Sequence, residues 1–327
     1  MISVRRYNND DFTVWNNFIA NAKNATFQFH RDYMDYHADR FDDYSLIVYF
    51  KNEIIALLPA NKSGNKEISS HSGLTYGGLI LAKEIKLNLY LQILYTLMDF
   101  LHNNDIDEII IKALPDFYSI LPSQEYNYGL FLVNAEKFRV DTSLTIIQNS
   151  RVKYQTRRNR SIKKAAKGQF EIKQDNDFES FWKKILEPNL MKRFGKKPVH
   201  SLDEILLLRS RFPNNIYQVN IYENNQIVGG TTMFITSNVA HAQYISANDY
   251  GRSSGGLDLL FDILINEQFS DKKYFDFGIC NENQGKRINH GLLDWKEGFG
   301  GRTYVHEFYR IKCKMKDEIL KVIKKNH

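Results

Sequence analysis

Long hydrophobic runs are missing from this sequence. No stretch of about 18 consecutive apolar residues occurs, which is the length that a membrane-spanning helix needs. The opening residues MISVRRYNNDDF turn polar before the hydrophobic region of a signal peptide can form. These absences predict a soluble, cytoplasmic protein without a membrane span.

Cysteine and the common cofactor motifs are equally scarce. The 327 residues include two cysteines, Cys280 and Cys313, which lack metal-ligand spacing and give no sign of a disulfide framework. No His-Glu-x-x-His, Cys-x-x-Cys, Walker loop or dinucleotide fingerprint occurs. We therefore expect a reduced compartment, no metal site and no nicotinamide cofactor.

Charge of one sign is in only slight excess. The formal net charge of +6 is modest for this length, so it does not predict a general nucleic-acid coat, although it favours an anionic substrate. A hydrophobic content of 43% supplies an adequate core for one large domain or two ordinary ones.

Hydrophobic periodicity divides the first half into alternating helices and strands. The predicted elements are helices over 11–22 and 31–40, two strands in YSLIVYFKNEIIALLPA, a third strand ending at SSHS, a helix over 86–104, and strands over 107–114 and 138–147.

The second half repeats this order at an offset of roughly 170 residues. The matching elements are two strands over 215–235, a strand over 238–249, a helix over 256–269, a strand over 272–278, a helix over 289–299 and a strand over 302–313. The repeat predicts two similar α/β domains, 1–150 and 151–327, each with a mixed, mostly antiparallel sheet flanked by helices.

A basic segment, RVKYQTRRNRSIKKAAKG, opens the second predicted domain at residues 151–168 and contains no acidic residue. Such a run is typical of a solvated helix face. It is equally compatible with a helix that binds phosphate groups or RNA, because guanidinium groups match phosphate bidentately.

Several segments carry a resemblance to a known family. The order of elements in each half is that of the GNAT acyltransferase fold. The segments RRNRSIKKAAKGQFEIK, NNQIVGGTTMF and YFDFGICNENQGKRINHGLLDWKEGFGG resemble the second half of FemABX-like proteins, a tandem-GNAT family. NATFQFHRDYMDYH and SHSGLTYGGLI are similar to the first half of that family. The resemblance covers almost the whole chain.

This resemblance implies an enzyme that transfers an acyl or aminoacyl group to an amine of a nucleotide-linked sugar or cell-envelope precursor. The donor would be acyl-CoA or aminoacyl-tRNA, with no tightly bound cofactor. The chain lacks the long inserted helical hairpin of tRNA-using members, which favours a general acyl donor. Two alternatives remain open: a non-catalytic protein that binds a nucleotide sugar, and an RNA-binding protein.

A candidate donor loop lies at the start of the helix over 256–269. The stretch Arg252-Ser253-Ser254-Gly255-Gly256 resembles the loop with which GNAT enzymes hold the pyrophosphate of acyl-CoA at a helix N-terminus, although the last small residue is replaced by leucine. The alternative is a polar loop before a helix. The first half has no such loop around Ala82-Lys83-Glu84.

Polar residues at equivalent strand ends form a second group of candidates. They are His71, Thr75 and Tyr76 in the first half, and Tyr244, Asn248 and Asp249 in the second. His71 or Asp249 could accept a proton, whereas the alternative for both is a polar residue that satisfies a turn.

The family resemblance adds further basic candidates. Lys296 occupies the lysine of the family's aromatic-Lys-x-x-Phe-Gly-Gly pattern and would neutralise a phosphate or polarise the acyl carbonyl; otherwise it is an exposed helix lysine. Arg31 and His37 on the Phe-Gln helix are candidates for binding substrate. Independently of the resemblance, Lys286 and Arg287 form a basic pair in a glycine-containing loop and are candidates for binding a nucleotide diphosphate.

Overall fold

The computed structural model describes residues 1–323, and its contacts divide the chain into two compact units. The first unit contains Met1–Asp141 and the chain from Val305 onward, and the second contains Thr142–Tyr304. The unit boundaries fall inside strands β8 (Glu136–Ile147) and β16 (Arg302–Lys312), so each of these strands belongs partly to both units. The domain division at residue 150 stays a sequence-based prediction.

The first unit contains two groups of strands. An antiparallel sheet has the order β1-β2-β3-β6, and β4, β5, β7 and β16 are neighbours in a second group. The strands are β1 (Ile2–Arg6), β2 (Leu46–Phe50), β3 (Glu53–Leu58), β4 (Asn61–Gly64), β5 (Glu67–Ser69), β6 (Ile80–Leu81) and β7 (Glu108–Lys112). The helices are α1 (Phe12–Asn21), α2 (Arg31–Met34), α3 (Leu87–His102), α4 (Glu125–Leu132) and α12 (Asp317–Leu320).

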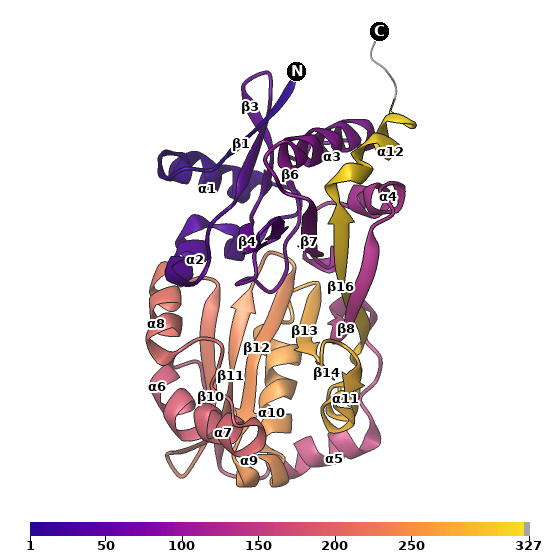
Figure 1. The fold of residues 1–327 in the computed structure, drawn as a ribbon. Helices are drawn as coiled ribbons and strands as arrows, with labels where there is room; N and C mark the ends of the chain where they lie inside the picture. The colour runs from indigo at the N-terminus through magenta and orange to yellow at the C-terminus, as the bar shows by residue number, and fades with distance from the viewer. Residues whose placement is uncertain (324–327) are drawn as a thin grey trace. The chain divides into compact units, whose positions relative to one another are not determined.

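Helix α3 supplies much of the core of the first unit (Figure 1). Its apolar residues recur at helical spacing, which places Leu91, Leu94, Leu97, Met98 and Leu101 on one buried face. This face packs with the buried residues of β2, β3 and β7 in a single hydrophobic cluster.

The second unit contains six neighbouring strands in the order β8-β13-β12-β11-β10-β9. The further strands are β9 (Phe170–Lys173), β10 (Ile216–Glu223), β11 (Gln226–Ile235), β12 (Val239–Ala247), β13 (Tyr274–Ile279), β14 (Asn281–Glu282) and β15 (Arg287–Ile288). The helices are α5 (Thr156–Ala165), α6 (Phe178–Phe181), α7 (Glu187–Phe194), α8 (Leu202–Arg211), α9 (Asp249–Ser253), α10 (Gly256–Ile263) and α11 (His290–Glu297).

Side chains of the second sheet alternate between two different environments. On one face, Met233 and Ala242 pack with Leu260 and Phe261 of α10 in the hydrophobic core. On the other face, hydroxyl, amide, carboxylate and imidazole side chains form hydrogen bonds along the strands, as in the bond from Thr232 to the side chain of Gln218. His241 and Asp276 lie on this polar face.

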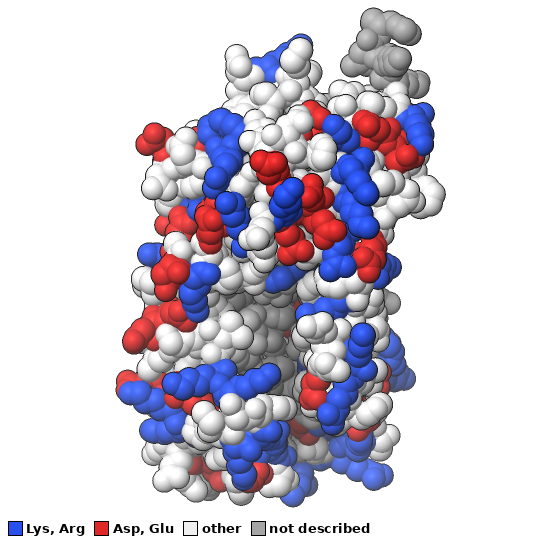
Figure 2. All heavy atoms as spheres, viewed as in Figure 1, with Lys and Arg blue, Asp and Glu red and all other residues white. Residues whose placement is uncertain are grey.

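The basic segment contains helix α5, which packs on the core through one face. Arg158, Ile162 and Ala165 are buried, whereas most of the other basic side chains are exposed. Gly255 stands where α5 meets α10: it has a φ of 87°, and a Cβ atom there would lie 2.8 Å from the carbonyl oxygen of Ser161. Figure 2 shows further Lys and Arg side chains over the part of this unit where Figure 1 labels α7.

No helix among residues 1–323 is long and apolar enough to cross a membrane.

Replacing Gly255 by alanine should destabilise the second unit more than the same change at Gly195. Both glycines have positive φ, 87° and 60°, which costs an alanine about 1 kcal/mol. Only Gly255 lacks room for a Cβ atom, since nothing lies within 4 Å of the position at Gly195. We expect G255A to lower the free energy of unfolding by about 3 kcal/mol and G195A by about 1 kcal/mol, measured by urea denaturation. Equal losses would contradict the tight packing of α5 on α10.

Candidate functional site

The parallel strands β12 and β13 separate after a short run of pairing. Their ladder ends at the pair His241 and Asp276, and β12 continues to Ala247 without β13 beside it. Gly278 follows with a φ of 74°, a conformation that favours glycine. The separation leaves the edge of β12 beyond His241 without a strand partner among the described residues, so its backbone groups can bind a ligand.

A cleft of about 460 Å³ opens at this end of β12. Its walls come from the end of β12 and from helices α5, α7, α10 and α11. Its lining includes the polar residues Arg158, Arg193, Ser246, Arg252 and Asp258 and the aromatic residue Trp295.

Three arginines line the cleft, and they differ in their partners. Arg158 is buried and forms an ion pair with Asp258. The guanidinium of Arg252 donates to the carbonyl of Ala247 and to the carboxylate of Asp249. Arg193 is exposed and makes no hydrogen bond or ion pair within residues 1–323. The cleft therefore offers an uncommitted cation to an anionic ligand.

The first turn of α10 also lines the cleft, with Leu257 and Asp258. A helix N-terminus attracts anions through its unpaired N–H groups. Here the carboxylate of Asp258 already accepts from Arg158 and, at 2.8 Å, from Nε1 of Trp295. Anion binding at this helix therefore depends on the arginines that surround it.

The candidate donor loop folds into the short helix α9 and the start of α10. The hydroxyl of Ser253 donates to the carbonyl of Tyr250 at 3.3 Å, and that of Ser254 accepts from the amide of Gly256 at 3.4 Å. Gly255 lies in contact with Ser161 of α5, where a Cβ atom would not fit. Arg252 borders the cleft, and the role of the loop in phosphate binding stays a prediction.

A buried histidine and aspartate meet where β12 and β13 separate. His241 Nδ1 lies 2.7 Å from Oδ2 of Asp276, which is fully buried. The other carboxylate oxygen accepts from the hydroxyls of Ser143 at 2.5 Å and Thr145 at 3.0 Å and from the amide of Gly278 at 3.1 Å. The carboxylate thus joins β8, β13 and β12 through hydrogen bonds.

Neither His241 nor Asp276 was a candidate from the sequence. Each is a polar residue inside an apolar strand pattern, NVAHAQYISAND and KKYFDFG, where an unsatisfied polar side chain would be costly. A polar residue in each of two apolar strands is therefore a signal in the sequence. It indicates that the two side chains form a hydrogen bond with one another when the strands are neighbours.

Lys296 of α11 is buried rather than exposed. Its ammonium donates to the carbonyls of Gly278 at 2.8 Å and Ile279 at 2.9 Å, and it also interacts with the thiol of Cys280. Burial lowers the pKa of Lys296. The ammonium therefore holds the end of β13, and its predicted contact with an acyl carbonyl or phosphate stays a prediction.

The other candidates at the end of β12 make local contacts. The hydroxyl of Tyr244 lies 2.7 Å from Nδ1 of His200. Asn248 caps α9 by accepting from the amide of Gly251 at 2.7 Å. Asp249 is exposed, and its hydrogen bond from Arg252 lowers the pKa of its carboxyl group, which makes it a weaker proton acceptor.

Lys286 and Arg287 lie at the turn and in the second strand of the exposed hairpin β14–β15. Arg287 reaches the carboxylate of Glu282 at 3.6 Å. Among the second-half candidates, the structure thus groups Asn248, Asp249 and Arg252, and it does not place Lys286 or Arg287 on the cleft.

His71 of the first unit occupies a strained and buried position. Its φ is 66°, its exposed fraction is 3%, and its Nδ1 has no hydrogen-bond partner in the described chain. Its ring stacks on that of His37, with centroids 5.3 Å apart. Burial, with the nearby charges of His37, Arg31 and Lys112, lowers the pKa of His71 to about 3.

Arg31 and His37 lie close to His71 but are themselves buried. The guanidinium of Arg31 pairs with Asp35 at 2.6 Å and Asp43 at 2.8 Å, so it is already neutralised. Nε2 of His37 lies 3.4 Å from the carbonyl oxygen of Gly73. His37 therefore contacts the loop after β5, whereas Arg31 joins α2 to Asp43. The binding of substrate by either residue stays a prediction.

Thr75 and Tyr76 follow in the same loop and face different environments. Thr75 is exposed, whereas Tyr76 is buried with its hydroxyl 3.2 Å from that of Thr26. The ammonium of Lys112 donates to the carbonyls of Ser72 and Leu74, and burial lowers its pKa to about 8. The loop is therefore held in place by hydrogen bonds to Lys112 of β7 and to Thr26.

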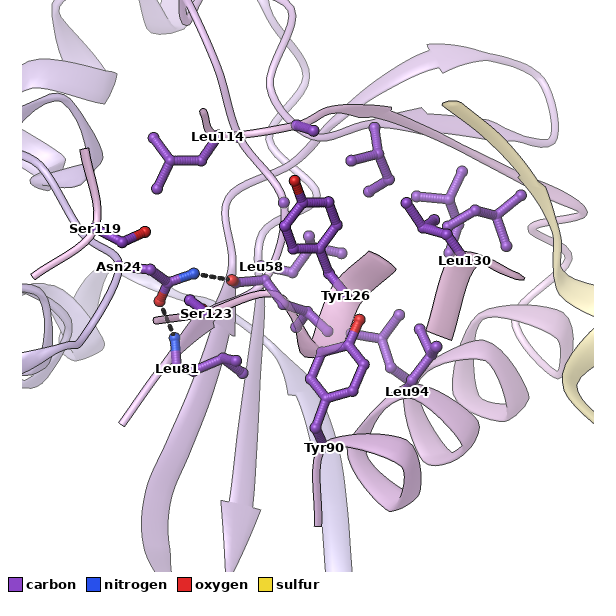
Figure 3. Close-up of a pocket in the computed structure, with 18 of the residues that line it drawn as sticks. Asn24, Leu58, Leu81, Tyr90, Leu94, Leu114, Ser119, Ser123, Tyr126 and Leu130 are labelled. Atoms are coloured by element: carbon purple, nitrogen blue, oxygen red, sulfur yellow. Dashed lines mark hydrogen bonds between the residues drawn. The ribbon is translucent and has the colours of Figure 1, made fainter. Parts of the chain in front are cut away.

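The first unit has a small apolar cavity where its own parallel pairing ends, beyond the bridge from Gly77 to Ala113 (Figure 3). Its volume is about 50 Å³, and most of its lining is leucine and isoleucine. The hydroxyl of Ser123 is buried there without a hydrogen-bond partner. No arginine lines this cavity, in contrast to the cleft of the second unit.

No group of three or more His, Cys, Asp or Glu side chains in the described part of the chain could hold a metal ion.

Comparison with known proteins identifies the fold. No family model and no curated protein matches the sequence. Among solved structures, FemX superposes with a TM-score of 0.64 over 98% of this chain and 100% of that chain, at 9% identity. L-PGS from Bacillus licheniformis gives 0.59 over 98% and 99%, also at 9% identity. A tandem GNAT protein from the clavulanic acid biosynthesis pathway gives 0.50 over 96% and 99%, at 9% identity.

These similarities confirm the predicted fold class: the chain has a FemX-like tandem GNAT fold. At such low identity these similarities establish the fold alone. The reaction has to be inferred from the side chains of the site itself.

Acidification should destabilise the protein through His71. Its pKa is about 3 when folded and near 6.5 when unfolded, so the unfolded state binds more protons between these values and stability falls as the pH is lowered below about 6.5. We expect this residue alone to cost about 1.4 kcal/mol per pH unit in that window. The variant H71N, whose asparagine tolerates positive φ, should show a shallower loss between pH 6.5 and 5 in urea denaturation. An unchanged slope would contradict the buried, neutral state of His71.

Removing the ammonium of Lys296 should destabilise the second unit. In K296M, the carbonyls of Gly278 and Ile279 lose their donor, and we expect the free energy of unfolding to fall by about 1–3 kcal/mol. The matched change K286M removes an exposed lysine and should stay within about 0.5 kcal/mol of the wild type. If both variants unfold at the same urea concentration, Lys296 does not hold the end of β13.

Proposed function

We propose that this protein is an N-acyltransferase. It moves an acyl group from an activated donor, acyl-CoA or aminoacyl-tRNA, to an amine of a nucleotide-linked sugar or cell-envelope precursor. The observation that carries this proposal is the separation of β12 from β13, which places a free strand edge beside an arginine-lined cleft.

The cleft suits the anionic part of either donor. Both donors carry phosphate groups, and a charge-assisted hydrogen bond from arginine to phosphate is among the stronger polar contacts in proteins. Arg193 has no competing partner within residues 1–323, and Arg252 lies on the same cleft. Trp295 adds an aromatic wall, on which a nucleotide base can stack.

The free edge of β12 suits the reacting part of the donor. Acyl transfer needs donors for the oxyanion that forms on the carbonyl carbon, and backbone N–H groups supply these without any side chain. Strand residues beyond His241 present such groups where β13 has departed. The amine attacks the carbonyl carbon, the new C–N bond forms, and the thioester C–S bond or ester C–O bond breaks.

The proposal is tested by measuring acyl transfer when the purified protein is given a donor and an acceptor together. Purified protein supplied with acyl-CoA and a panel of nucleotide amino sugars should release free CoA, detected with a thiol reagent. R193Q should raise the KM for acyl-CoA about 10- to 100-fold, the loss expected for one charge-assisted hydrogen bond. The matched variant R160Q, which changes an exposed arginine of α5 that does not line the cleft, should keep the wild-type KM.

Two other results would overturn the proposal. If neither acyl-CoA nor charged tRNA reacts or shifts the melting temperature while a nucleotide sugar alone raises it, the protein is a binding module. If R160Q weakens retardation of tRNA without any acyl transfer, the basic helix α5 serves RNA binding instead.

A further inference from the structure

We infer that His241, held by Asp276, is the group that takes the proton from the attacking amine. The inference rests on the proposed acyl transfer and adds to it the catalytic residue. It comes from the position of the pair: His241 and Asp276 are the last partners of the β12–β13 ladder before the strands separate.

The hydrogen bonds of Asp276 fix which nitrogen of His241 carries the proton. The carboxylate accepts from Ser143, Thr145 and the amide of Gly278, and at 2.7 Å it meets Nδ1 of the imidazole. A carboxylate only accepts, so Nδ1 is protonated, and in the neutral imidazole Nε2 has the lone pair. A buried aspartate that orients a histidine in this way serves the same purpose in catalytic triads.

The imidazole of His241 is the more exposed member of the pair. The side chain of His241 is 10% exposed, whereas that of Asp276 has no exposed surface. The neighbour of Nε2 is Oε1 of the half-buried Gln243, 3.2 Å away. Half a turn of this amide exchanges its oxygen and nitrogen, so that its NH2 group faces the lone pair of Nε2. An amine that reaches Nε2 takes the place of this single amide contact.

The absence of a side chain at Gly278 leaves space beside the imidazole ring of His241. A Cβ atom at this position would lie 3.2 Å from Cε1 of His241, against the carbon next to Nε2. The glycine that turns β13 away from β12 therefore also keeps the edge of the imidazole uncovered.

In the proposed reaction, His241 takes a proton from the amine and returns it to the leaving group. The amine nitrogen forms a bond to the carbonyl carbon and gives its proton to Nε2 of His241. The C–S or C–O bond to the leaving group breaks, and the imidazolium returns the proton to the departing thiolate or alkoxide. The negative charge of Asp276 stabilises the imidazolium between these two events.

Two titratable groups of the second unit, besides the pair itself, interact with it. Asp276 contacts the imidazole directly, and Cys280 and Lys296 interact electrostatically with Asp276. Burial raises the pKa of the Cys280 thiol, which keeps it neutral. The ammonium of Lys296 is bound to the backbone, so neither group competes for the proton of the amine.

The test measures the rate of acyl transfer against pH. In the wild type the rate should fall on acidification, because a protonated imidazole cannot accept a second proton. H241Q should lower kcat about 10²- to 10⁴-fold, with little change in the KM for the donor, and should lose this dependence on pH. D276N should lower kcat similarly, because its amide no longer selects the same protonated nitrogen.

A rescue experiment separates catalysis from folding. H241A in the presence of added imidazole should recover part of the lost rate, which a purely structural histidine would not allow. H102Q, which changes an exposed histidine of α3 in the first unit, should keep the wild-type rate and pH profile.

The outcomes distinguish the two proposals. A wild type that transfers acyl groups, together with an H241Q variant of unchanged rate and pH profile, overturns the role of His241 and leaves the proposed function standing. A wild type that transfers no acyl group to any amine overturns the proposed function itself. A melting temperature of H241A equal to that of the wild type, with no rescue by imidazole, also overturns the role of His241.

Discussion

The fully buried carboxylate of Asp276 is the interaction on which the second unit depends. A charge without exposed surface is costly unless its hydrogen bonds are satisfied, and Asp276 binds Ser143 and Thr145 of β8, the amide of Gly278 and His241 of β12. These bonds hold three strands together at the point where two of them part. The open edge of β12 and the cleft beside it therefore exist because one carboxylate secures the strands at the base of the opening.

The two units use the same strand arrangement for different purposes. In each, a parallel pairing ends and a space follows, but the lining differs: the first unit has leucine and isoleucine around about 50 Å³, and the second has three arginines around about 460 Å³. The first unit instead concentrates its polar groups around the loop after β5, where His71 stacks on His37 and Lys112 of β7 donates to the carbonyls of Ser72 and Leu74. The duplicated fold has thus kept its geometry while the chemistry of the halves has diverged.

The sequence predicted those features that depend on neighbouring residues. The helical spacing of apolar residues located α3, and the alternating patterns located the strand pairs β2–β3 and β10–β11. These strands are joined at Lys51 and Asn52, and at Asn224 and Asn225, which have the positive φ angles that such hairpins require. The candidate site was harder to predict, because its geometry joins distant segments. His241 and Asp276 are 35 positions apart and meet only through strand pairing. The burial of Lys296 depends on the end of β13, which no local pattern in α11 specifies.

Helix α7 has a consequence for how a ligand exchanges with the cleft. It supplies Arg193 and Phe194 to the wall, yet none of its residues is buried, whereas α10 on the other wall buries Leu257, Leu260 and Phe261. The free energy needed to displace an element locally rises with the apolar surface that it buries. Local displacement of α7 therefore costs less free energy than displacement of α10. A bulky ligand of the cleft can therefore exchange through displacement of α7, without loosening the strands that hold Asp276.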